Sequence, residues 1–162
     1  MCAPTGHPRL VPEQTPARAF AELRARFAAT PDSVPEARRF VVTTLISWGR
    51  VTLLDDAALC VTELTANAAL HSSSTYMEVA LRAHEGGIRI SVQDDCPTPA
   101  EAVAPYPNIV SSDAGFPHEN HPTTGRGLAI VATLAREWGV EKLELGKRIW
   151  VELAEPTPRS RT

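Results

Sequence analysis

Apolar residues recur at helical spacing in two segments of the first half of the chain. One segment runs from Ser33 to Trp48 and is followed by Gly49, a common helix stop. The second covers residues 53–71, where apolar residues flank a set of polar ones. We therefore predict two amphipathic helices, with Ser33 or Asp32 as the N-cap of the first.

Apolar and polar residues alternate in residues 75–83 and 88–92, as they do in half-buried strands. The Glu85-Gly86-Gly87 turn between the two runs predicts an antiparallel hairpin. A second hairpin is predicted within residues 140–153, where Gly146 and Lys147 form the turn.

A third helix is predicted from Gly125 to Gly139, because Leu128, Ile130 and Val131 form an apolar face. Residues 18–29 fit either a short helix or a strand. Helices that alternate with hairpins predict a two-layer α/β sandwich. We expect the helices to cover one face of a mixed, mostly antiparallel sheet.

The length of 162 residues fits one domain with a single core. We place this domain at residues 18–154, between a proline-containing tail at 1–17, which we expect to be flexible, and a polar tail at 155–162. Charged residues make up 22% and hydrophobic residues 43% of the chain, which is typical of a soluble globular protein.

The charge and the cysteines exclude several classes of function. A net charge of -3 gives no broad basic surface, so we expect no direct contact with nucleic acid. The three cysteines lack the spacing of a zinc site or a disulfide framework, which fits a reducing compartment. No segment has the pattern of a signal peptide or of a membrane span, and the predicted location is the cytoplasm.

Three polar residues share one face of the second predicted helix. Glu63, Asn67 and His71 follow one another in steps of four residues, which align side chains along a helix. A carboxylate, a carboxamide and an imidazole in such a row can line a binding pocket. The same row can also be the solvated side of an amphipathic helix.

Two later segments contain further candidate ligand contacts. Asp94 follows a predicted strand, and strand ends are common places for contacts with small molecules. Gly125-Arg126-Gly127 begins the third helix, where backbone amides can bind a phosphate, although such a pattern is often only a turn. Between them, residues 96–123 contain six prolines and no periodicity, which fits either a functional loop or a plain surface insertion.

In this order, the segments DDAALCVTELTANAALH, VQDDCP and TGRGLAIV resemble the nucleotide-binding boxes of the GHKL ATP-binding superfamily, which includes gyrase and the histidine kinases. Within it, the chain most resembles the small anti-sigma-factor serine/threonine kinases. The resemblance covers residues 18–154 and implies the histidine-kinase-like ATPase fold, with ATP and Mg²⁺ as cofactors. It also implies that residues 96–123 are the ATP lid.

The resemblance implies a role for each matched residue. Glu63 looks like the general base, Asn67 like the magnesium ligand, and Asp94 like the acceptor of the adenine amino group. Arg126 matches a position that reaches the terminal phosphate and is the second implied catalytic residue. The implied nucleotide contacts are Asn67, His71, Asp94, Cys96, Gly125, Arg126, Gly127 and Leu128.

Two positions depart from the pattern of the superfamily. Cys96 stands where the second box usually has a glycine, which puts close backbone approach to the base in doubt. The last box usually supplies a threonine near the adenine, but this chain has Lys147, Arg148 and Ile149 there. An adenine contact from the last strand is therefore left open.

The implied activity is transfer of the ATP γ-phosphate to a serine or threonine of an anti-sigma-factor antagonist, by a kinase that also sequesters a sigma factor. A homodimer is compatible with this resemblance. The alternative is a non-catalytic module that uses nucleotide to change which protein it binds. Glu63 favours the enzyme, because a pure binding module needs no general base. A third interpretation treats the three boxes as turns and caps of a protein without a ligand.

Overall fold

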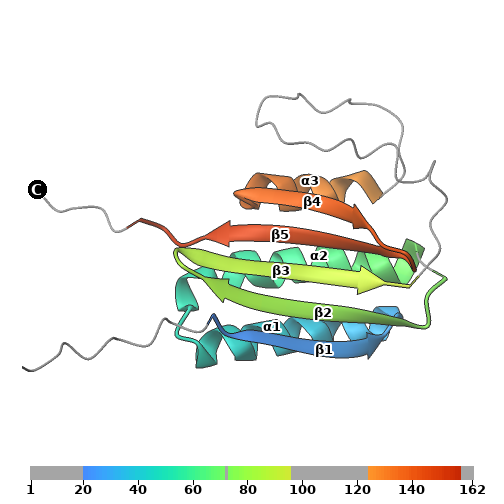
Figure 1. Cartoon of the computed structure of the whole chain (residues 1–162), viewed down its shortest axis with the longest axis horizontal. Helices are drawn as coiled ribbons and strands as arrows, with labels where there is room; N and C mark the ends of the chain where they lie inside the picture. Colours follow the sequence, from blue (N-terminus) through green and yellow to red (C-terminus); the bar gives the residue numbers. More distant parts are fainter. Residues whose placement is uncertain (1–19, 72, 96–123, 158–162) are drawn as a thin grey trace, which may run out of the picture.

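The computed structural model describes residues 20–71, 73–95 and 124–157, which form one sheet backed by three helices (Figure 1). The tail at 1–17, the predicted lid at 96–123 and residues 158–162 lie outside the described residues. In chain order the elements are β1 (Glu22–Ala28), α1 (Val34–Ser47), α2 (Leu54–His71), β2 (Tyr76–His84), β3 (Gly87–Asp94), α3 (Thr124–Leu134), β4 (Glu137–Lys142) and β5 (Lys147–Ala154). Short 3-10 turns precede α1 and α2.

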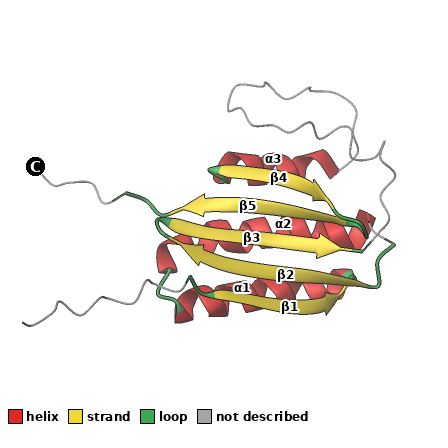
Figure 2. Ribbon diagram, viewed as in Figure 1, coloured by secondary structure: helices red, strands yellow, loops and turns green. Residues whose placement is uncertain are grey.

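The predicted two-layer fold class is confirmed. The strand order is β1-β2-β3-β5-β4, and each strand pair in the described part of the chain is antiparallel. Figure 2 shows the three helices on the same face of this sheet. The ambiguous segment at 18–29 forms β1, an edge strand that pairs with β2.

The first two helices form where the apolar periodicity predicts them. α1 begins directly after Ser33, although the Ser33 side chain makes no capping hydrogen bond. Gly49 follows α1 with a φ of 70°, a left-handed conformation that glycine adopts without steric cost. α2 packs against α1 on one side and α3 on the other. No helix in the described ranges has both the length and the apolar character needed to cross a bilayer.

The third helix is shorter than predicted, because its last predicted residues belong to a strand. α3 ends at Leu134, and Trp138 and Gly139 pair with Val151 and Trp150 of β5. A Cβ atom at Gly139 would lie 2.8 Å from Cζ2 of Trp150, so the indole requires a glycine opposite it. Lys147, predicted in the turn of the hairpin, is instead the first residue of β5.

The central strands bury alternate side chains against the helices. On β3 these are Ile88, Ile90 and Val92, and the same alternation turns the last residue of the strand, Asp94, toward the helices. These strand residues pack against apolar residues of α1 and α2, and Asp94 is one of few polar residues buried among them. The core therefore ends at a buried carboxylate at one edge of the helix-covered face.

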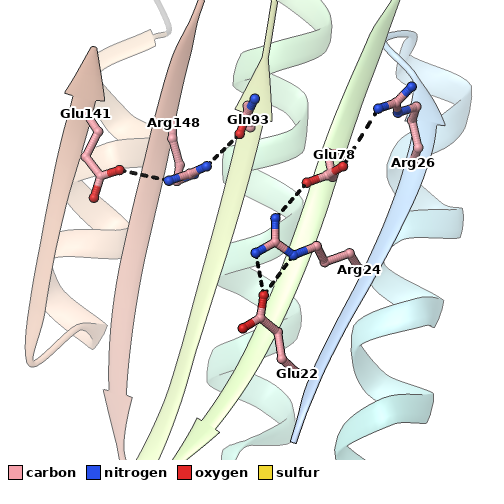
Figure 3. Close-up of polar contacts among 7 residues, drawn as sticks. All are labelled: Glu22, Arg24, Arg26, Glu78, Gln93, Glu141 and Arg148. Carbon is pink, nitrogen blue, oxygen red and sulfur yellow. Dashed lines mark hydrogen bonds and ion pairs between the residues drawn. The ribbon is translucent and has the colours of Figure 1, made fainter. Parts of the chain in front are cut away.

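The opposite face of the sheet is polar. Figure 3 shows two separate groups of side chains on this face, with hydrogen bonds and ion pairs inside each group. In one group Arg148 reaches Glu141 at 3.0 Å and Gln93 at 2.8 Å. The other group consists of Glu22, Arg24, Arg26 and Glu78, and its ion pairs raise the pKa of Arg24, chiefly through the hydrogen bond to Glu22. Exposed ion pairs of this kind contribute little to stability, so the main packing interactions lie on the helix side.

Candidate functional site

The predicted polar ridge on α2 carries two described side chains on adjacent turns, and the first of them, Glu63, lies against α3. Glu63 and Asn67 are both half-buried, and neither hydrogen-bonds another described residue. The helix needs neither of them for capping, because both lie well inside its bounds. Two polar groups on adjacent turns are thus available for a ligand. The side chain of His71, the third member of the ridge, lies outside the described part.

The first turn of α3 lies directly against this ridge. A Cβ atom at Gly127 would collide with Oε2 of Glu63 and would lie 3.4 Å from its Cδ. With a glycine here, the α3 backbone and the Glu63 carboxylate meet without a side chain between them, whereas a Cβ atom would displace the carboxylate. Leu128, next in the chain, is 6% exposed and anchors the helix in the core. Because the first four amides of a helix lack partners within it, the turn beside Glu63 has N–H groups that can bind an anion.

The buried carboxylate at the end of β3 forms an ion pair with the neighbouring strand. Nζ of Lys147 lies 2.9 Å from Oδ2 of Asp94, and the two side chains are 14% and 3% exposed. The two residues face each other in the β3–β5 register. Asp94 was identified from the sequence, but Lys147 was not. A lysine at the start of the last strand was visible, yet only the strand register shows that it reaches Asp94.

The turn before β5 lies against the backbone of Asp94. Gly146 has a φ of 92°, and a Cβ atom there would lie 2.7 Å from the carbonyl carbon of Asp94. The same atom would lie 2.8 Å from Cα of Asp95. A glycine is therefore required both by the backbone conformation and by the close approach of the two strands.

The polar ridge of α2 and the carboxylate of Asp94 both lie on the helix-covered side of the sheet. α2 packs across β3, and its C-terminal end leads within a few residues to the start of β2. The second residue of β2, Met77, pairs with Asp94. The C-terminal half of α2 is thus at the same end of the sheet as Asp94. Cys96 and the side chain of Arg126 lie outside the described part, and the roles of Cys96, Gly125 and Arg126 stay predictions.

No group of three or more histidine, cysteine, aspartate or glutamate side chains in the described ranges could hold a metal ion by itself. Asn67, the predicted magnesium ligand, supplies one carboxamide oxygen, which is a donor that Mg²⁺ accepts. Mg²⁺ usually takes its other ligands from water and from substrate phosphates. The donor set therefore fits a metal that arrives with a nucleotide better than a resident metal.

A buried thiol lies one turn before Glu63 on α2. Cys60 has no exposed surface. Burial raises the pKa of its thiol to about 12, and the nearby carboxylates of Asp56 and Glu63 add to the shift. The thiolate is the reactive form, so this cysteine is chemically inert in the folded protein.

We expect iodoacetamide to alkylate Cys60 at least roughly 100-fold more slowly in the native protein than in denaturant at pH 8, because the thiol is neutral and shielded. Peptide mass spectrometry would measure the rate at this residue alone. The pKa of the folded thiol lies above that of an unfolded thiol, which is about 8.5. The free energy of unfolding therefore contains the full contribution of this thiol below about pH 8.5, and the contribution declines as the pH rises toward 12. The stability advantage of the parent over Cys60→Ala should therefore shrink between about pH 8 and pH 10. Equal alkylation rates in the two states would contradict the burial of this thiol.

Comparison with known proteins identifies the family. The family model described as the histidine kinase-like ATPase domain matches residues 27–153, which span the region from β1 to β5. No curated protein matches the chain significantly. The observed antiparallel sheet and the three helices behind it are consistent with the fold of the matched family. The chain therefore belongs to the histidine kinase-like ATPase domain family, which implies that it binds ATP.

Proposed function

We propose that the chain is a protein kinase that transfers the ATP γ-phosphate to a serine or threonine of an anti-sigma-factor antagonist. The same domain would sequester a sigma factor, in the cytoplasm and as a homodimer. The observation that carries the proposal is the approach of Gly127 to Glu63, which puts a carboxylate beside the first-turn amides of α3. A phosphate bound by these amides lies within reach of a general base.

Three described side chains support the proposed nucleotide site. Asp94, buried at the end of β3, can accept a hydrogen bond from the adenine amino group. Asn67 can hold Mg²⁺, which when bound neutralises charge on the phosphates. Oδ1 of Asp95 is buried and has no hydrogen-bond partner in the described part of the chain, so it is a further acceptor whose partner the proposed ligand or solvent would supply.

In the proposed reaction the hydroxyl oxygen of the acceptor serine attacks the γ-phosphorus of ATP. Glu63 takes the hydroxyl proton as the new O–P bond forms. The bond between the γ-phosphorus and the β–γ bridging oxygen breaks, and ADP leaves with the electron pair. Arg126 and the amides of α3 would stabilise the charge on the transferred group.

Asn67→Ala should lower the affinity for ATP by about tenfold or more in the presence of Mg²⁺, because the metal loses its protein ligand. The affinity without Mg²⁺ should change little. Isothermal titration calorimetry with ATP, with and without Mg²⁺, measures both values.

Thr62→Ala is the matched control for this variant. Thr62 lies on the same helix and is also half-buried, but its hydroxyl donates to the carbonyl of Ala58 at 2.7 Å and is not on the ridge. This variant should bind ATP·Mg²⁺ as the parent does. Equal affinity of the parent and Asn67→Ala for ATP·Mg²⁺ would remove Asn67 from the metal site.

A further inference from the structure

The ion pair between Asp94 and Lys147 is not explained by stability alone. Its members are 3% and 14% exposed, and their atoms are 2.9 Å apart. Burying two charges costs desolvation energy, which the attraction between them roughly offsets, so apolar residues at both positions would stabilise the fold as well. A buried pair at the edge of a predicted ligand site therefore calls for a role toward the ligand.

We propose that Lys147 forms half of the nucleobase site and donates a hydrogen bond to a ring nitrogen of adenine next to the 6-amino group. This inference rests on the proposed ATP site, in which Asp94 accepts a hydrogen from the same amino group. It makes Lys147 a specificity-determining residue. It also answers the question left open by the sequence, since the last strand supplies a base contact through a lysine.

The hydrogen-bonding groups of the pair match the edge of adenine. A lysine ammonium carries three N–H donors, and one of them is used on Oδ2 of Asp94. The pair thus presents an acceptor, the carboxylate, beside a donor, the ammonium. Adenine presents the complement, because its amino donor lies between two acceptor nitrogens, N1 and N7. A base bound to Asp94 through its amino group places one of these nitrogens toward Lys147.

The sheet places the backbone of Lys147, and the ion pair with Asp94 places its ammonium. Lys147 is the first residue of β5 and lies opposite Asp94 in the register of two rigid strands. Gly146 holds the turn against the backbone of Asp94, so the lysine side chain starts from a defined point. A donor held in this way before binding discriminates between bases better than a mobile surface lysine.

The test compares ATP with two analogues that replace a single ring nitrogen by carbon, 1-deaza-ATP and 7-deaza-ATP. The parent should bind one of them about tenfold or more weakly than ATP, because a charged donor loses its acceptor. In Lys147→Met this preference should fall to less than about threefold. Lys142→Met is the matched control, since Lys142 lies opposite Lys147 on β4 but is exposed and should retain the preference of the parent.

Removing the lysine alone leaves a buried carboxylate without its cation, which can prevent folding. The double variant Asp94→Asn/Lys147→Met removes both charges and keeps an amide oxygen for the amino group, so it preserves a measurable protein. Its preference between ATP and the analogues should also be lost.

The outcomes separate this inference from the proposed function. If the parent binds ATP and both analogues equally well, the inference is wrong and the ATP site stands. A preference that persists in Lys147→Met or in the double variant overturns it in the same way. If the parent binds no ATP at all, the proposed function is wrong, and the role of Lys147 falls with it. Loss of the preference in the variants, with retention in Lys142→Met, supports the role of Lys147.

Discussion

Glu63→Gln should lower the rate of phosphate transfer by roughly 10²–10⁴-fold, the usual contribution of a general base, while ATP binds as it does to the parent. Glutamine has nearly the same shape as glutamate, so it preserves the contact with Gly127 but cannot take a proton at pH 7. The change therefore removes the proton acceptor and leaves the packing around it unchanged. The rate is measured with γ-labelled ATP and candidate antagonist proteins, and ATP affinity is measured by calorimetry.

Asp55→Asn provides the control on the same helix. It makes the same change from acid to amide, but Asp55 is exposed in the first turn of α2 and far along the helix from Gly127. Its phosphate transfer should equal that of the parent. Unchanged transfer by Glu63→Gln would place the base elsewhere. ATP binding by the parent without transfer to any candidate would favour the non-catalytic module that the sequence also allowed.

Much of the fold could be predicted because its signals are local. The helical period around Glu63 and Asn67 and the alternation through Ile90 and Val92 each depend on neighbouring residues. The same alternation carries Asp94 onto the helix-covered face, so the candidate site residue and the core follow from one pattern. These features did not require knowledge of which strand lies beside which.

The features that were missed depend on pairing between distant segments. The apolar run of α3 gave no sign that the helix ends at Leu134, because Trp138 is drawn into the sheet by its partner strand. The ion pair of Lys147 with Asp94 joins residues that are far apart in sequence, and it exists only in the observed register of β3 and β5. Alternation tells which face each residue takes, but it does not tell which strands are neighbours, and no hairpin turn joins β3 to β5.

Gly146→Ala should destabilise the protein by roughly 3 kcal/mol or more, which is among the larger effects of a single substitution. Two costs combine at this position. The φ of 92° is unfavourable for any residue with a side chain, and the new Cβ atom would lie 2.7 Å from the carbonyl carbon of Asp94. The second cost is severe because the atoms in the way are backbone, which cannot rotate aside as a side chain can. Urea unfolding of the parent and the variant measures the difference in free energy.

Gly86→Ala separates the two costs. Gly86 forms the other hairpin turn with a φ of 82°, yet no atom lies within 4 Å of a Cβ atom built there. This variant has the backbone penalty without the collision and should lose only about 1 kcal/mol. The excess loss in Gly146→Ala then measures how tightly the last hairpin holds the backbone of Asp94. Equal losses in the two variants would mean that the hairpin yields easily, and the carboxylate and its lysine would then lack the fixed geometry that discrimination between nucleobases requires.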